Sequence, residues 1–169
     1  MKKLFIRAPA CGRRLRNYQI SHAGFTLIEI LVVIGIIAIL AAVVLVAINP
    51  ARQFKLARDS QRQSNVTAIL NAVGQNLAEN KGIFTCGSAS TSIPNTKTLM
   101  KSSGGFDVGP CLVPTYISTL PFDPSATGAH YSSNSDYDTG YTIATDSDGR
   151  ITISAPATEV ASQEISVTR

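Results

Sequence analysis

The chain has few of the residues that carry out catalysis. Only one of its two histidines, His130, lies beyond the first 24 residues, and a lone histidine in a loop is more often a surface residue than a general base. Its 169 residues contain no Gly-x-Ser-x-Gly sequence, phosphate-binding loop or zinc-ligand spacing. Cys86 and Cys111 are explained better as a disulfide than as catalytic thiols. We therefore expect that the protein is not an enzyme.

Acidic residues are absent from the first 24 residues, which hold six of the fifteen basic ones. The rest of the chain has nine basic and eleven acidic residues, a formal charge of −2. The basic isoelectric point of about 9.1 therefore reflects the N-terminal segment. Because the downstream part is mildly acidic, we do not expect it to bind nucleic acid.

The longest apolar run extends from Phe25 to Ile48, and Glu29 is its only ionisable residue. As a helix of about 1.5 Å per residue it would be roughly 36 Å long, enough to cross a hydrocarbon core of about 30 Å. The apolar region of a secretory signal peptide is shorter, at roughly 7 to 15 residues. The run is therefore predicted to be a single membrane span, and the basic residues before it place the N-terminus in the cytoplasm.

Glu29 has two interpretations, because a carboxylate within a span is costly. In the first, Thr26 is the N-cap of the helix and Glu29 completes a capping box. In the second, Glu29 pairs with a cation that another subunit brings alongside it. The residues alone leave both interpretations open.

The segment Gly24-Phe-Thr-Leu-Ile-Glu29-Ile-Leu-Val-Val-Ile-Gly-Ile-Ile-Ala-Ile-Leu-Ala-Ala closely resembles the class III signal of type IV pilins and pseudopilins. The resemblance implies cleavage between Gly24 and Phe25 by a prepilin peptidase, which then methylates the new N-terminal amine of Phe25. It also implies that Glu29 neutralises the N-terminal amine of a neighbouring subunit during assembly.

The resemblance further implies a structural subunit of a type IV pilus, or of a pseudopilus of the type II secretion or competence kind. Its expected partners are the prepilin peptidase, other copies of itself, minor pilins or pseudopilins, an assembly platform protein with its ATPase, and membrane lipids. The subunit would wait in the cytoplasmic membrane and then enter an extracytoplasmic filament. The alternative is a single-pass membrane protein whose outer domain binds or senses a ligand without polymerising.

An amphipathic stem follows the span over residues 49–82. Pro50 either kinks a continuous helix or, with Asn49 as N-cap, is the first residue of a new helix. Farther along, apolar residues recur at helical spacing, and Gly82 is a plausible stop. This stripe consists of Val66, Ile69, Leu70, Val73 and Leu77.

Four cations occupy the polar surroundings of the stem, namely Arg52, Lys55, Arg58 and Arg62. Lipid headgroups, acidic neighbouring subunits and DNA are all conceivable partners. We expect these cations to be solvated or to pair between subunits, because DNA binding usually requires a broader basic surface.

Residues 83–169 are predicted to form an extracytoplasmic head, with Cys86 and Cys111 joined in a disulfide. A loop is expected over residues 85–101, a hairpin over 141–154 and a strand near 130–132. Residues 158–169 are expected to be a tail or a weak strand. The segment 116–124 resembles a short motif of pseudopilin heads. The predicted fold is therefore α+β and pilin-like, with a long N-terminal helix packed on a small antiparallel sheet.

The aspartates of the head raise the question of calcium, because hard oxygen donors suit Ca²⁺. The candidates are Asp136, Asp138, Asp146 and Asp148. The sequence has no EF-hand loop, and Asp-x-Asp-Gly is first of all turn chemistry. We therefore expect no obligatory cofactor, with Ca²⁺ as a secondary possibility.

Overall fold

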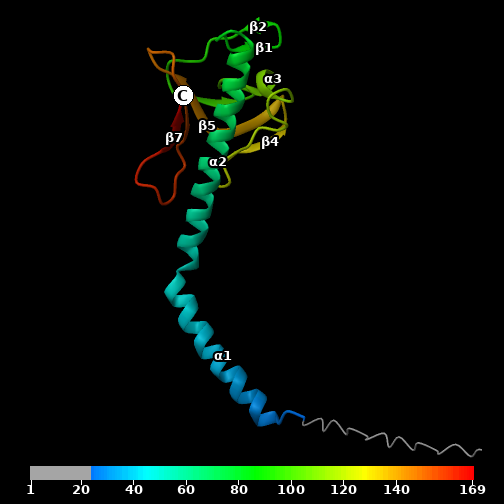
Figure 1. Cartoon of the computed structure of the whole chain (residues 1–169), viewed down its shortest axis with the longest axis vertical. Coiled ribbons are helices and arrows are strands. Elements are labelled where there is room, and N and C mark those ends of the chain that lie inside the picture. The colour runs from blue at the N-terminus through cyan, green and yellow to red at the C-terminus, as the bar shows by residue number, and fades with distance from the viewer. Residues whose placement is uncertain (1–23) are drawn as a thin grey trace, which may run out of the picture. The chain divides into compact units, whose positions relative to one another are not determined.

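The computed structural model describes residues 24–169 (Figure 1). The leader expected over residues 1–24 lies outside this range, apart from Gly24. The chain forms two compact units, with the boundary between Val44 and Leu45. Helix α1 (Leu27–Ile48) contributes most of its length to the first unit, and the second holds helix α2 and the sheet.

Helix α1 is long and apolar enough to cross a membrane, and none of its 22 residues is buried. It begins after Thr26, whose Oγ1 accepts a hydrogen bond from the backbone N–H of Glu29 at 3.2 Å. This contact is one half of the predicted capping box, and it satisfies an N–H group that the helix itself leaves unpaired.

Helix α2 (Pro50–Glu79) begins with its own cap. Asn49 has a left-handed backbone (φ 48°), and its side-chain oxygen accepts a hydrogen bond from the N–H of Arg52 at 3.3 Å. Pro50 is thus the first residue of a new helix, the second of its two predicted roles. At the other end Gly82, with φ 86°, donates its N–H to the carbonyl of Leu77 at 2.8 Å. The helix thus ends at Glu79, three residues before the predicted stop at Gly82.

The main sheet has five antiparallel strands, in which β3, β5, β6 and β7 are neighbours in that order and β4 also pairs with β5. Their bounds are β3 (Thr98–Lys101), β4 (His130–Ser133), β5 (Asp136–Thr145), β6 (Ile151–Ala155) and β7 (Ile165–Thr168). A two-stranded hairpin, β1 (Thr85–Cys86) and β2 (Ala89–Ser90), and the short helix α3 (Gly109–Leu112) complete the second unit.

The core lies between α2 and one face of the sheet. α2 packs mainly on β6 and β7. The stripe residues Val66, Ile69 and Val73 are fully buried there, together with Ile143 and Ile153 of the sheet. Burying an aliphatic side chain of this size contributes about 1.5–3 kcal/mol, so the stripe is the main apolar attachment of the helix. The predicted α+β, pilin-like fold is confirmed.

Two segments differ from the sequence-based expectation. The loop predicted over residues 85–101 contains β1, β2 and β3, and β3 is a full member of the main sheet. The segment expected to be a tail or a weak strand ends in β7, which pairs with β6. Both β3 and β7 are only four residues long, so their strand character comes from pairing with β5 and β6 rather than from their own pattern.

Cys86 and Cys111 are joined in a disulfide, as predicted. It links the β1–β2 hairpin to α3, and both elements lie beside the end of α2. There the side chain of Asn76 donates to the carbonyls of Thr85 and Cys111, at 2.8 and 3.2 Å. Closing a loop of this length stabilises a protein by about 3.5 kcal/mol, mainly by restricting the unfolded chain.

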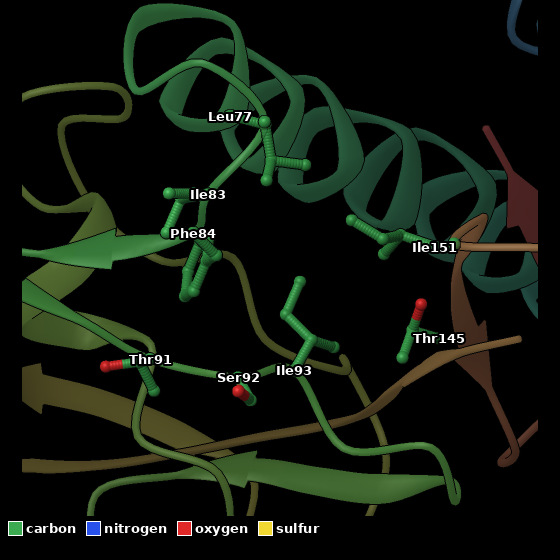
Figure 2. Close-up of a pocket in the computed structure, with 10 residues that line it drawn as sticks. Leu77, Ile83, Phe84, Thr91, Ser92, Ile93, Thr145 and Ile151 are labelled. Carbon is green, nitrogen blue, oxygen red and sulfur yellow. The ribbon is translucent and has the colours of Figure 1, made fainter. Parts of the chain in front are cut away.

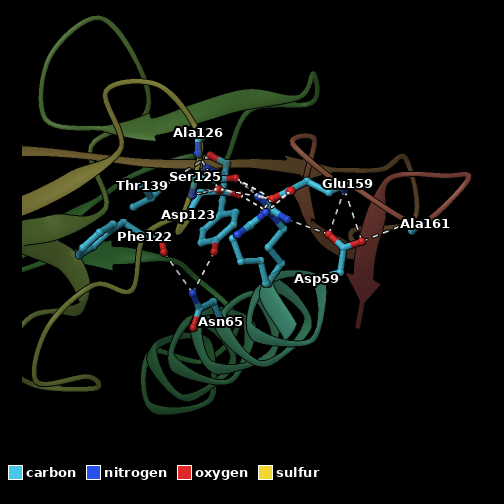
Figure 3. A network of polar contacts seen from close by, with 12 residues as sticks. Asp59, Asn65, Phe122, Asp123, Ser125, Ala126, Thr139, Glu159 and Ala161 are labelled. Atoms are coloured by element: carbon cyan, nitrogen blue, oxygen red, sulfur yellow. Dashed lines mark hydrogen bonds and ion pairs between the residues drawn. The ribbon is translucent and has the colours of Figure 1, made fainter. Parts of the chain in front are cut away.

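A buried arginine joins α2 to two loops of the head. The side chain of Arg62 has no exposed surface, and its guanidinium donates to both carboxylate oxygens of Asp123, at 2.7 and 3.0 Å. The same guanidinium donates to Asp59 at 2.7 Å, to Ser125 at 2.6 Å and to Glu159 at 3.3 Å (Figure 3). Such a planar, forked donor is well suited to bind two carboxylates at once.

Asp59 fixes the second of these loops through its backbone. Its carboxylate accepts hydrogen bonds from the N–H groups of Glu159, Val160 and Ala161, at 3.0, 2.8 and 3.2 Å (Figure 3). Glu159 is held in addition by two hydrogen bonds from Arg58. The segment between β6 and β7 is therefore attached to the first half of α2 by charged hydrogen bonds.

The carboxylates of this network have low pKa values. Hydrogen bonds from Arg58 and then from Ser125 and Arg62 lower the pKa of Glu159 to about 2. Burial acts to raise the pKa of Asp123, but hydrogen bonds from Arg62 and from backbone N–H groups outweigh it. The pKa of Asp59 is lowered in the same way, as its three backbone donors and Arg62 outweigh burial. All three groups are therefore ionised at neutral pH.

The expectation that Arg58 and Arg62 are solvated or pair between subunits is wrong. Arg62 and Asp59 are buried, and Arg58 is only partly exposed and bound to Glu159. Arg62 lies one turn before the apolar stripe, and Asp59 and Arg58 lie two turns before it. All three are on the same side of the helix as the stripe, so they face the head rather than solvent.

We predict that Arg62→Gln lowers the free energy of unfolding by about 3–5 kcal/mol, because it leaves the carboxylate of Asp123 buried without a cation. Arg52→Gln makes the same change at an exposed position of α2 and should stay within about 0.5 kcal/mol of wild type. Urea unfolding of the full chain in detergent, followed by near-UV circular dichroism of the buried Tyr137 and Tyr141, measures both. Equal stability of the two variants would contradict the role assigned to Arg62.

The network also predicts a pH dependence. Asp59, Asp123 and Glu159 have lowered pKa values in the folded state, so these carboxylates stabilise the fold. Their contribution to the free energy of unfolding is complete above their pKa in the unfolded chain, about 4, and is lost as the pH falls through their pKa values in the folded protein. The free energy of unfolding should thus be nearly constant from pH 7 to 5 and decrease toward pH 2. In Arg62→Gln, protonation relieves the unpaired Asp123, so the stability gap to wild type should narrow on acidification. A gap that stays constant between pH 7 and 3 would contradict this account.

Candidate processing and assembly site

The predicted cleavage site lies at the start of the described chain, directly before α1. Gly24 is exposed, and a Cβ atom added to it would meet no other atom within 4 Å. Phe25 is 77 % exposed. Neither residue is held by a hydrogen bond to another part of residues 24–169. The peptide bond between them is therefore open to an enzyme, which a cleavage site requires.

Glu29 lies in the first turn of α1, one turn beyond Phe25. Its backbone N–H is capped by Thr26, but within residues 24–169 its carboxylate has no hydrogen-bond or ion-pair partner. A negative charge is favoured at this end of a helix, since it faces the positive end of the helix dipole. The cap and the dipole explain why Glu29 is tolerated in α1, and they leave its carboxylate oxygens available to a cation.

The surface of α1 is apolar on all sides. Its exposed side chains are almost entirely aliphatic, and none of its residues is buried. A helix that is hydrophobic all round needs an apolar surrounding, which is either lipid or the matching helices of other subunits. Its only ionisable group is the carboxylate of Glu29.

The candidate calcium ligands do not gather into one site. Asp146 and Asp148 both pair with Arg150 in the turn between β5 and β6, at 3.1 Å each. Asp136 contacts His130 at 3.2 Å. Within the described range no group of three or more His, Cys, Asp or Glu side chains is placed to hold a metal ion. The guanidinium of Arg150 also opposes the binding of a cation by the two carboxylates it contacts.

His130 is an exposed residue at the start of β4. The carbonyl of Gly128, 2.6 Å from its Nδ1, and then the carboxylate of Asp136 raise its pKa above the usual value. Asp136 in turn has a lowered pKa, chiefly because of His130. Within residues 24–169 no hydroxyl or thiol group is hydrogen-bonded to this histidine, so the pair lacks the arrangement of a catalytic site.

A cavity of about 540 Å³ lies between the end of α2 and the turn that follows β5. Figure 2 shows the side chains of Leu77, Phe84, Ile93 and Ile151 around it, with the hydroxyl group of Thr145 at its margin. None of its lining residues is acidic, basic, a histidine or a cysteine. The cavity therefore has no group for proton transfer or metal binding.

Reasoning from the sequence missed the network around Arg62. Asp59 and Arg62 precede the stripe residue Val66 by seven and four positions, which continues the buried side of the helix by two turns. That spacing could have predicted that both residues are buried and paired, because charged side chains at core positions need partners of opposite charge or hydrogen-bond partners. The sequence could not have predicted that Asp123 and Glu159 are these partners, because both lie in irregular loops.

Comparison with known proteins gives one match. Residues 21–45 match the family model of the prokaryotic N-terminal methylation motif. No curated protein and no solved structure matches the chain. The matched segment contains Gly24, Phe25 and Glu29 and extends through most of α1. The chain thus carries a prokaryotic N-terminal methylation motif on an apolar N-terminal helix, consistent with the signal of a type IV pilin or pseudopilin.

Proposed function

We propose that this chain is a structural prepilin subunit of a type IV pilus or of a pseudopilus. It is cleaved between Gly24 and Phe25, is methylated at the amine of Phe25, and polymerises through α1. The observation that carries the proposal is the match of residues 21–45 to the methylation motif, on an apolar helix none of whose residues is buried.

Polymerisation gives α1 a second environment of the same polarity as lipid. In the membrane the aliphatic side chains of α1 contact acyl chains, and in a filament they contact the α1 helices of other copies. Because both surroundings are apolar, transfer between them costs little hydrophobic free energy. The choice between membrane and filament then depends on the polar groups at the end of α1.

Glu29 and the amine of Phe25 are those polar groups. Cleavage creates an ammonium group four residues before Glu29, and each charge is costly by itself in an apolar medium. When copies pack side by side, the carboxylate of one can neutralise the amine of the next. This pairing favours one axial register over others, since only that register places both charges at the same depth.

The remaining parts of the chain fit the role of a filament subunit. The span anchors the unprocessed chain in the cytoplasmic membrane with its N-terminus inside, and the disulfide suits a head outside the cytoplasm. A prepilin peptidase, a platform protein with its ATPase, and other pilins would act on the subunit in turn.

The N-terminus of the mature protein tests this proposal. We expect mass spectrometry of protein purified from its own cells to find N-methylphenylalanine at Phe25 as the first residue. A membrane-anchored sensor that does not polymerise would keep its leader. A mature chain that still begins before Gly24 would overturn the proposal.

We predict that Glu29→Ala is inserted and cleaved normally but lowers filament yield at least tenfold, because the amine of Phe25 loses its partner. A tenfold loss corresponds to a pair worth about 1.4 kcal/mol per subunit. Immunoblotting of sheared filaments against total processed subunit measures the yield.

Thr26→Val is the matched control for the capping interpretation. It removes the hydroxyl that caps the N–H of Glu29 but keeps the carboxylate. If Glu29 acts by pairing between subunits, cleaved Thr26→Val subunits should assemble nearly as well as wild type. Normal assembly of Glu29→Ala together with failure of Thr26→Val would instead assign Glu29 to the cap alone.

A further inference from the structure

The first two turns of α2 carry a group of side chains that the fold does not use. Arg52 and Lys55 are exposed and form no ion pair or side-chain hydrogen bond within residues 24–169. Phe54 lies between them in the sequence and is 65 % exposed, although it belongs to the largely polar first half of α2. We call these three residues the basic collar.

The structure divides the four stem cations into two kinds. Arg58 and Arg62, farther along the helix, are bound to carboxylates of the head. Arg52 and Lys55, nearer the span, have no acidic partner in the described chain. Glu159 lines the same cavity of about 440 Å³ as these two cations, but its carboxylate is hydrogen-bonded to Arg58, Arg62 and Ser125 and to neither of them. The three carboxylates of the network exceed its two arginines by one negative charge, so the collar and the network together carry one net positive charge.

The collar lies within reach of a membrane surface whatever the angle between the two helices. Pro50 follows Ile48, the last residue of α1, by two positions, or at most about 7 Å. At about 1.5 Å per residue, Arg52 and Lys55 lie about 3 and 8 Å farther along α2, so their Cα atoms are at most about 10 and 15 Å beyond Ile48. The headgroup layer on each side of a bilayer is about 5–8 Å thick, so Arg52 lies close to its outer edge and Lys55 at most about 10 Å beyond it.

The direction of the side chains shortens this distance. In a helix every Cα–Cβ bond tilts toward the N-terminus, which for α2 is the end that follows the span. Long basic side chains also extend their charged ends toward lipid phosphates while their stems cover apolar surface. Phe54 lies at the same level of α2 but on another face, about 200° around the helix from Arg52 and about 100° from Lys55. An exposed aromatic ring at this level suits the boundary between headgroups and acyl chains.

We propose that the basic collar binds the phosphate groups of anionic phospholipids in the leaflet from which α2 emerges, with Phe54 inserted at the acyl boundary. Charge complementarity and continuity with the span favour a phospholipid over any other partner. The contact would hold the unassembled subunit at a defined depth and would have to break when the subunit leaves the membrane.

The absence of tryptophan in the chain allows a direct test. Phe54→Trp creates the only tryptophan of the chain, at the collar, and Phe122→Trp creates one at an exposed aromatic position of the head. Each full-length variant is placed in liposomes of equal parts phosphatidylglycerol and phosphatidylcholine, with bromine on the acyl chains of one lipid at a time, and its tryptophan is excited selectively at the red edge of the absorption band. We expect quenching of Phe54→Trp and none of Phe122→Trp.

The same probe reports which lipid lies beside the collar. Each Lys or Arg near an anionic membrane surface raises the binding constant for that surface by a factor of about five. Brominated phosphatidylglycerol should therefore quench the tryptophan of Phe54→Trp severalfold more than brominated phosphatidylcholine. Adding Arg52→Gln and Lys55→Gln should make the two lipids equal. Lys81→Gln with Lys101→Gln removes the same charge elsewhere and should leave the preference intact.

Two results would overturn the proposal. One is the absence of quenching of Phe54→Trp, which would place the collar outside the bilayer. The other is equal quenching by both lipids while Arg52 and Lys55 are present. If the Arg52→Gln, Lys55→Gln variant keeps its lipid preference but assembles poorly, the cations serve a neighbouring subunit instead. The quenching readouts do not depend on cleavage at Gly24 or on polymerisation, so the proposed function stands or falls separately.

Discussion

The buried guanidinium of Arg62 is the contact around which the second unit is organised. A cation that is fully removed from water needs hydrogen-bond acceptors from the protein. Those of Arg62 come from three separate parts of the chain: α2 itself, the loop around Asp123 and the segment around Glu159. The apolar stripe attaches the helix to the sheet without much directional preference. The charged network fixes the position of the two head loops on α2, because a guanidinium can donate two good hydrogen bonds to a carboxylate only within a narrow range of orientations. It also determines which stem cations remain free for other partners.

The two helices are built for different solvents. α1 has a single ionisable group and an aliphatic surface on all sides, whereas α2 alternates between a buried stripe and a charged exterior. The change occurs over three residues, from Ile48 to Pro50, and coincides with the left-handed backbone of Asn49. The polarity of the chain and its hydrogen bonding therefore change at the same place.

The sequence was most informative where one strong pattern dominated. The apolar run, the stripe that begins at Val66 and the Asp-Gly turn after Thr145 each predicted the correct element. It was least informative where an element depends on its neighbour: β3 and β7 are too short to show a period, and they exist because β5 and β6 offer them partners. The pairing of Arg62 with Asp123 joins residues 61 positions apart, and no local pattern encodes such a contact.

The cap at Asn49 has a mechanical consequence. The backbone ladder of α2 begins with Arg52 and Gln53, which both donate to the carbonyl of Asn49, and Pro50 has no N–H with which to continue the ladder of α1. Unwinding that starts in α1 therefore has no shared backbone bond through which to spread into α2. A tensile load on the N-terminal segment would stretch α1 first, while the head keeps its shape.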